Sequence, residues 1–259
     1  MKQIEDNIRE LNKLQNLQQR SHWMNRLHPL GKLLVCVIYI FVVASFDKYA
    51  IDKLIVMAIF PVFCFIVGDL SLKEGLYRMR LILPLVLFVG VFNPFFDRKV
   101  LFTMAVAGSQ VQVTGGVISM LSLMVKGLFS VLSAYILIAT TSIEEICYAL
   151  RILRVPKIIV IVIMLIYRYF GLMGAEADRI TTAYMLRAPK QKGIHYSAWG
   201  SLVGQWLLRS MDRANAVYES MTLRGFNGDF RVKRKSVSAS DFLYPFIWIV
   251  LFIYIRHFY

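Results

Sequence analysis

The apolar residues of this chain are gathered into long runs with few charges. Five runs are each about long enough to cross the ~30 Å hydrocarbon core of a bilayer as a helix. They cover residues 30–46, 50–68, 81–96, 117–140 and 242–259. The charged segment 69–80 is expected to be a loop, and residues 97–116 are polar or β-prone with glycine breakers.

A sixth apolar segment, 158–174, leaves the number of spans open between five and six. If the N-terminus is inside and this segment also crosses, the strongly basic region 176–240 lies outside, against the rule that Lys and Arg stay on the cytoplasmic side. We therefore favour five spans, with 158–187 forming a long helix at the cytoplasmic interface. Six spans is the alternative.

The region between the last two spans is predicted to hold three cytoplasmic helices. The first is capped by Ser142, carries two acidic residues in its first turn and ends near Arg154. The second begins near 158 and must stop by Ala188, because Pro189 disfavours helix in the residue before it. The third is amphipathic, running from about 197 to 224, with Gly225 as its C-terminal cap.

The fold class is therefore an all-α membrane protein with about five transmembrane helices and a cytoplasmic block of three helices, two of them long. The predicted regions are an N-terminal cytoplasmic arm (1–29), four transmembrane helices (30–140), the cytoplasmic block (141–240) and a last transmembrane helix (241–259). We expect a multi-pass protein of the cell membrane (the inner, or cytoplasmic, membrane) with its N-terminus in the cytoplasm.

Composition agrees with this picture. The 259 residues are 58% hydrophobic, with a mean hydropathy of +0.58 and a net charge of +14. On a membrane protein such a charge favours contact with anionic lipid, so we expect the bilayer and no nucleic acid as a partner. The three cysteines form no CxxC, the four histidines are scattered, and the sequence lacks phosphate-loop, GxSxG and HExxH motifs. We predict no catalytic, cofactor-binding or metal-binding residue in this chain.

Two arginines stand out because each closes a long cytoplasmic helix. Arg187 lies between Leu186 and Ala188, and Arg224 lies between Leu223 and Gly225. A cation at a helix C-terminus needs no function, since the helix dipole favours it by ~0.3–1 kcal/mol. The guanidinium is nonetheless the side chain best suited to a carboxylate-lined groove of another protein.

Two further basic residues lie inside apolar segments. Lys126 is within the fourth span and Arg168 interrupts the 158–174 segment. A cation at membrane depth costs ~2.5–3.5 kcal/mol unless it meets a partner, so both are candidates for a contact with another helix or subunit. Glu176 and Arg179 have the i,i+3 spacing of a surface ion pair on the second cytoplasmic helix.

Several motifs together resemble CbiQ, the transmembrane (T) component of energy-coupling factor (ECF) transporters, in its cobalt branch. The resemblance covers most of 23–230 and rests on Trp23 with Leu27-His28-Pro29-Leu30-Gly31-Lys32, Thr140-Thr141-Ser142-Ile143-Glu144-Glu145, Leu153-Arg154-Val155-Pro156, Tyr167-Arg168-Tyr169, Leu208-Arg209-Ser210 with Asp212-Arg213-Ala214, and Met221-Thr222-Leu223-Arg224-Gly225-Phe226-Asn227-Gly228.

The resemblance implies a non-catalytic subunit of an ABC-type transporter complex. Arg187 and Arg224, with their flanking residues, would each dock into one of two cytosolic ATPase subunits, which bind ATP and Mg. A separate CbiM-like membrane subunit would bind the substrate, cobalt, for cobalamin biosynthesis. The family usually has Ala where this chain has Leu186 and Leu223.

Other functions stay open at this point. Nickel and vitamin importers of the same class share the arginine motifs. A stand-alone channel or secondary transporter would need paired broken helices with polar ligands at the midplane, and Pro84, Asn93-Pro94 and Lys126 are few for that role. A membrane-embedded enzyme is disfavoured because acid/base and metal clusters are missing from the sequence.

Overall fold

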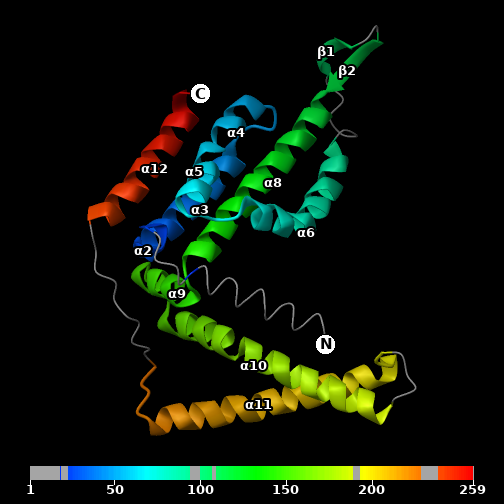
Figure 1. The fold of residues 1–259 in the computed structure, drawn as a ribbon, viewed down its shortest axis with the longest axis vertical. Helices are drawn as coiled ribbons and strands as arrows, with labels where there is room; N and C mark the ends of the chain where they lie inside the picture. Colours follow the sequence, from blue (N-terminus) through cyan, green and yellow to red (C-terminus); the bar gives the residue numbers. More distant parts are fainter. Residues whose placement is uncertain are drawn as a thin grey trace. The chain divides into compact units, whose positions relative to one another are not determined.

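The computed structural model describes residue 18 and residues 23–93, 100–106, 109–188, 193–228 and 239–258. These residues form two compact units (Figure 1). The described elements of the core unit are α2 to α6, an antiparallel pair of strands, α8 and α12. The α9–α11 unit contains the three helices that follow α8. Each unit is described by itself.

The elements of the core unit are helical apart from the two strands. They are α2 (Trp23–Arg26), α3 (Pro29–Ser45), α4 (Ile51–Val56), α5 (Ile59–Val67), α6 (Leu72–Val91), β1 (Val100–Val106), β2 (Ser109–Thr114), α8 (Gly115–Thr140) and α12 (Ala239–Phe258). The elements of the other unit are α9 (Ile143–Ile152), α10 (Lys157–Arg187), the 3₁₀ turn η1 (Tyr196–Ala198) and α11 (Trp199–Leu223).

Helix α8 is central to the core unit, where it packs against α3, α4, α5 and α6. It is antiparallel to α6, and two glycines allow these helices to approach closely. A Cβ on Gly90 would lie 3.1 Å from the Met120 side chain, and one on Gly127 would lie 3.3 Å from Val86. Small residues serve this purpose in membrane proteins, where helices gain little from hydrophobic burial against each other.

Aromatic side chains fill the space between α3, α5 and α12. The Tyr39 ring lies 4.6 Å from Phe60 and 5.3 Å from Phe252, and Phe60 lies 4.9 Å from Trp248, all as centroid distances. Tyr39 and Phe252 are almost fully buried. Edge and tilted contacts of this kind add to the packing of large apolar surfaces.

The second predicted span, 50–68, is divided in the structure into α4 and α5. The helix tightens at Met57 and Ala58, whose amides donate to carbonyls three residues back. Pro61 has no N–H to give to the Met57 carbonyl, which accepts instead from the Phe60 amide at 3.4 Å and from the buried Tyr39 hydroxyl at 3.0 Å. The prediction of one continuous helix was therefore wrong at this point.

Two other boundaries differ from prediction. The segment 69–80 was predicted to be a loop, but α6 begins at Leu72 and continues through Pro84. Strands β1 and β2 pair antiparallel with an irregular register between Val100 and Phe102, which departs from an all-α fold. These strands fall in the stretch that the sequence marked as β-prone. By contrast, α8 and α12 lie close to the predicted runs 117–140 and 242–259.

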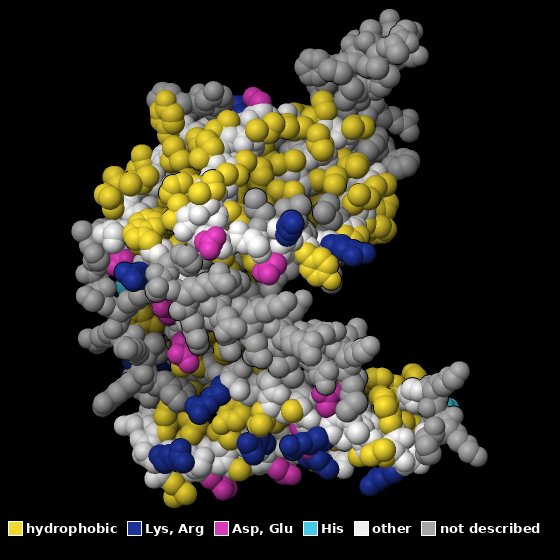
Figure 2. All heavy atoms as spheres, in the orientation of Figure 1, with side chains coloured by type: hydrophobic (Ala, Val, Ile, Leu, Met, Phe, Trp, Pro, Cys, Tyr) yellow, Lys and Arg dark blue, Asp and Glu magenta, His cyan; other side chains and the backbone are white. Residues whose placement is uncertain are grey.

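Two helices of the described chain, α8 and α10, are long and apolar enough to cross a membrane, and α3 is a shorter apolar helix. Hydrophobic side chains cover much of the visible face of the core unit, while Lys and Arg gather over the α9–α11 unit (Figure 2). Such an apolar surface is typical of a membrane protein.

Candidate functional site

Helix α9 opens the second unit and ends in a tight turn. Glu144 and Glu145 occupy its first turn, where the helix dipole favours negative charge. At its end the Val155 amide donates to the Leu150 carbonyl and the Arg154 amide to that of Arg151, with Arg154 at φ 63°. These bonds form a Schellman motif, in which the left-handed position usually belongs to glycine.

The ends of α10 and α11 agree with their predicted stop signals. Helix α10 ends at Arg187, and Ala188 leaves the helical region with φ −127°. Helix α11 ends at Leu223, and Gly225 adopts φ 76°. The Phe226 amide then donates to the Met221 carbonyl at 3.0 Å, so Gly225 is the C-terminal cap of a second Schellman motif.

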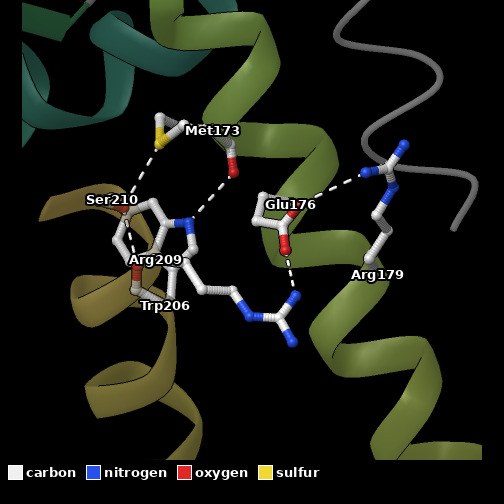
Figure 3. A network of polar contacts seen from close by, with 6 residues as sticks. All are labelled: Met173, Glu176, Arg179, Trp206, Arg209 and Ser210. Atoms are coloured by element: carbon white, nitrogen blue, oxygen red, sulfur yellow. Dashed lines mark hydrogen bonds and ion pairs between the residues drawn. The ribbon is translucent and has the colours of Figure 1, made fainter. Parts of the chain in front are cut away.

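Helices α10 and α11 are antiparallel and cross about midway along α10 (Figure 1). At the crossing, the Trp206 indole N–H donates to the Met173 carbonyl at 3.1 Å and the Ser210 hydroxyl lies 3.3 Å from the Met173 sulfur (Figure 3). Nearer the connecting segment, the His195 amide donates to the Tyr184 hydroxyl at 3.4 Å. These contacts show that α10 and α11 run in opposite directions.

The crossing also contains a charged network centred on Glu176 (Figure 3). One carboxylate oxygen pairs with Arg209 of α11, and the other lies 3.5 Å from Arg179 of its own helix. The hydrogen bond from Arg209 is the main reason that the pKa of Glu176 lies below its ordinary value. The Arg179 pair was predicted from i,i+3 spacing, whereas the bond between helices was missed.

Arg187 and Arg224 lie at opposite ends of this helix pair. From the crossing point and a rise of 1.5 Å per residue, the two helix tips are on the order of 40 Å apart. Both side chains are exposed, and neither forms a hydrogen bond or ion pair within the described parts of the chain. The neighbouring Leu186 and Leu223 are 77% and 88% exposed. Each tip therefore presents one cation and one large apolar side chain.

Lys126 makes the contact between helices that its position in α8 suggested. Its ammonium group donates to the Phe46 carbonyl and lies 3.5 Å from the Ala44 carbonyl, at the C-terminal end of α3. The exposed carbonyls of a helix end are a favourable partner for a cation. Arg168 differs, because it is exposed and makes no such bond with any described residue.

Lys32 makes a polar contact that was not predicted from the sequence. It is only 4% exposed, and its ammonium group donates to the Thr140 carbonyl at 2.8 Å. Gln18 donates to the nearby Ile138 carbonyl at 2.8 Å. Two side chains from the N-terminal part of the chain thus satisfy carbonyls at the end of α8, which have no partner within the helix.

The described residues contain no group of three or more His, Cys, Asp or Glu side chains that could hold a metal ion. Cys147 of α9 is buried, and burial raises the pKa of its thiol, which keeps it protonated. The site that the residues build in the α9–α11 unit is therefore a pair of exposed cationic tips on a braced helix crossing. Such an arrangement can dock to other proteins.

Comparison with known families places the chain in a transport family. The family model described as CbiQ, cobalt transport protein, matches residues 20–236, which include every described element from α2 to α11. Among curated proteins the comparison finds no match.

Proposed function

Because this chain belongs to the CbiQ family of cobalt transport proteins, we propose that it is the transmembrane coupling subunit of an ATP-driven ECF-type cobalt importer. In this role it transmits conformational change from two cytosolic ATPase subunits to a separate substrate-binding membrane subunit. The chain itself performs no hydrolysis. ATP and Mg belong to the ATPase subunits, and cobalt is the cargo of a CbiM-like partner.

The observation that carries the proposal is the placement of the two arginine tips. Arg187 and Arg224 are exposed at opposite ends of an antiparallel pair, about 40 Å apart by helical rise. That separation lets two ATPase subunits each hold a tip at the same time. Both arginines are available for bidentate bonds to carboxylates because neither pairs within the described chain.

The mechanism follows from the crossing. When ATP draws the two ATPase subunits together, the tips that they hold are brought closer and the angle between α10 and α11 changes. The helices are held together at the crossing by Glu176, Arg209 and Trp206, so the crossing acts as a pivot. The change of angle then displaces the outer surface of the helix pair. The substrate-binding subunit is reoriented by that movement.

We place the α9–α11 unit in the cytoplasm and favour five spans with an outside C-terminus. The apolar half of α10 is long enough to cross a membrane, but a crossing there would export the basic residues that follow it. Arg168, exposed within that apolar half, would then face a partner subunit or the lipid headgroups. Nickel or a vitamin is the alternative cargo.

Charge reversal at both tips tests the docking role. The double variant Arg187→Glu with Arg224→Glu should release the ATPase subunits from the membrane, since loss of each buried charge pair costs ~2–5 kcal/mol of affinity. A single reversal should leave one ATPase bound. Co-purification of tagged subunits and quantification of their ratio measure both effects.

A charge-matched control is available within the same two helices. Lys157→Glu with Arg213→Glu makes an equal change in net charge at exposed sites away from the tips. This variant should retain both ATPase subunits. Normal co-purification of the tip variant, or equal loss from the control, would contradict the docking role. ATP-dependent uptake of labelled cobalt and nickel by the whole complex then identifies the cargo.

A further inference from the structure

A groove on the core unit is not used by the proposed coupling role. Its volume is about 310 Å³, and its walls come from α2, α5 and one face of α12. The α12 wall presents Leu243, Ile247 and Leu251 at helical spacing, and Trp23 and Phe63 form the facing walls. Among the described residues of the lining, the polar groups are the Tyr244 hydroxyl, the two indole N–H groups and the hydroxyl of Ser240 at the start of α12. The groove is thus apolar along its body.

One end of the groove is aromatic, and Arg26 lies next to it on α2 without being part of the lining. The Trp23 ring stacks edge-on against Tyr244 with centroids 6.3 Å apart, and Trp23 remains 49% exposed. Arg26 follows Trp23 by three residues on the same short helix, which places the two side chains beside each other. Arg26 is exposed and forms no hydrogen bond or ion pair with the residues that the structure describes. Tryptophan and arginine in this combination are typical of the boundary between hydrocarbon and headgroups.

We propose that this groove binds one anionic phospholipid of the surrounding bilayer, with an acyl chain along α12 and the phosphate on Arg26. The shape and charge of the site fit this occupant. A volume near the lower end of the range for small-ligand sites fits a single flexible chain, and a planar guanidinium bonds a phosphate bidentately. The proposal depends on membrane location alone and is independent of the coupling function.

Tryptophan fluorescence offers a direct test. The chain has four tryptophans, and replacing Trp199 and Trp206 by Phe leaves only Trp23 and Trp248, both of which line the groove. The protein is reconstituted with increasing fractions of phosphatidylglycerol or phosphatidylcholine that carries brominated acyl chains. We expect phosphatidylglycerol to reach half-maximal quenching at a several-fold lower mole fraction, because only its headgroup carries a net negative charge.

Three variants in this background separate chain binding from headgroup binding. Arg26→Gln should remove the preference for phosphatidylglycerol while quenching persists. Lys73→Gln, an exposed cation on α6 outside the groove lining, should keep the preference. Ser240→Phe should fill the groove and weaken quenching by both lipids. If this variant fails to fold, Ile247→Phe, two turns further along α12, should have the same effect.

Two results would overturn the proposal. The first is equal quenching by the two lipids in the unmodified groove, which means that only bulk bilayer lipid reaches the tryptophans. The second is a pair of findings: quenching is lost on assembly with the partner subunits, and Ser240→Phe weakens assembly in the chain that keeps Trp199 and Trp206. Together they would assign the groove to a partner's transmembrane helix.

Discussion

The two units of this protein differ in how many of their side chains they bury. In the core unit, Tyr39, Phe60 and Phe252 are buried against one another. In the α9–α11 unit, α10 buries only Val160 and Ile180, and none of the residues of α11, all of which are described, is buried. The core unit is held by its interior, whereas α10 and α11 are held together by a few contacts at their crossing and one nearer the connecting segment.

Charged groups follow the same division. Lys32 and Lys126 of the core unit donate to backbone carbonyls at helix ends, so each ammonium group has a hydrogen-bond partner within its own chain. Arg187 and Arg224 stand exposed at helix tips and form no such bond within the described residues. A unit that satisfies its own polar groups is a scaffold, and one that leaves them exposed is suited to bind other subunits.

Truncation of the same side chain in the two units should show the largest difference. Phe252→Ala removes a ring that is 1% exposed and should cost about 3–5 kcal/mol of unfolding free energy. Phe170→Ala removes a ring that is 66% exposed and should change stability by less than about 0.5 kcal/mol in the isolated chain. Denaturant unfolding of purified protein in detergent measures both values.

Equal losses from the two truncations would refute the contrast, because Phe170 would then be as well packed as Phe252. A loss of stability in Phe170→Ala that appears only in the assembled complex would sharpen the contrast between the two units. That outcome would mean that the exposed face of α10 is buried by a partner rather than by its own chain.

The sequence predicts the helix ends best where a single residue decides them. Gly225 fixes the end of α11 because glycine adopts φ 76° without steric cost, and Pro189 stops α10 because it disfavours helix at Ala188. The predicted bounds of α8 and α12 were also close, since a long apolar run has few other structures available in a bilayer.

Features that depend on distant residues could not be predicted. At the break between α4 and α5, Tyr39 donates to the carbonyl of Met57, which lies 18 residues further along the chain. The pair formed by Glu176 and Arg209 joins residues 33 positions apart, and nothing in the sequence sets the register of α10 against α11. The charged residues likewise marked 69–80 as a loop, although all of them except Asp69 lie in the first turns of α6.

Weakening the crossing between α10 and α11 should have a smaller effect than truncating Phe252. Arg209→Gln removes the main partner of Glu176 and should raise hydrogen exchange along α11 several-fold, while Arg179→Gln, whose side chain is 79% exposed, should change exchange little. Because the pKa of Glu176 lies below its ordinary value of 4.5, its contribution is present above that pH and is lost as the pH falls through the lowered pKa. Acid should therefore loosen the original protein more than Arg209→Gln, and equal responses would exclude the pair as a brace.

The smallest effects concern the two Schellman turns, where opposite substitutions should have opposite signs. Arg154 holds φ 63° against the preference of a side-chain-bearing residue, so Arg154→Gly should stabilise α9 by about 0.5–1 kcal/mol. Gly225 holds φ 76°, so Gly225→Ala should destabilise the end of α11 by about 1 kcal/mol. Thermal unfolding of the two variants tests the pair. Loss of stability in Arg154→Gly would mean that the Arg154 side chain contributes more than its backbone strain costs, which would make this turn another contact point of the α9–α11 unit.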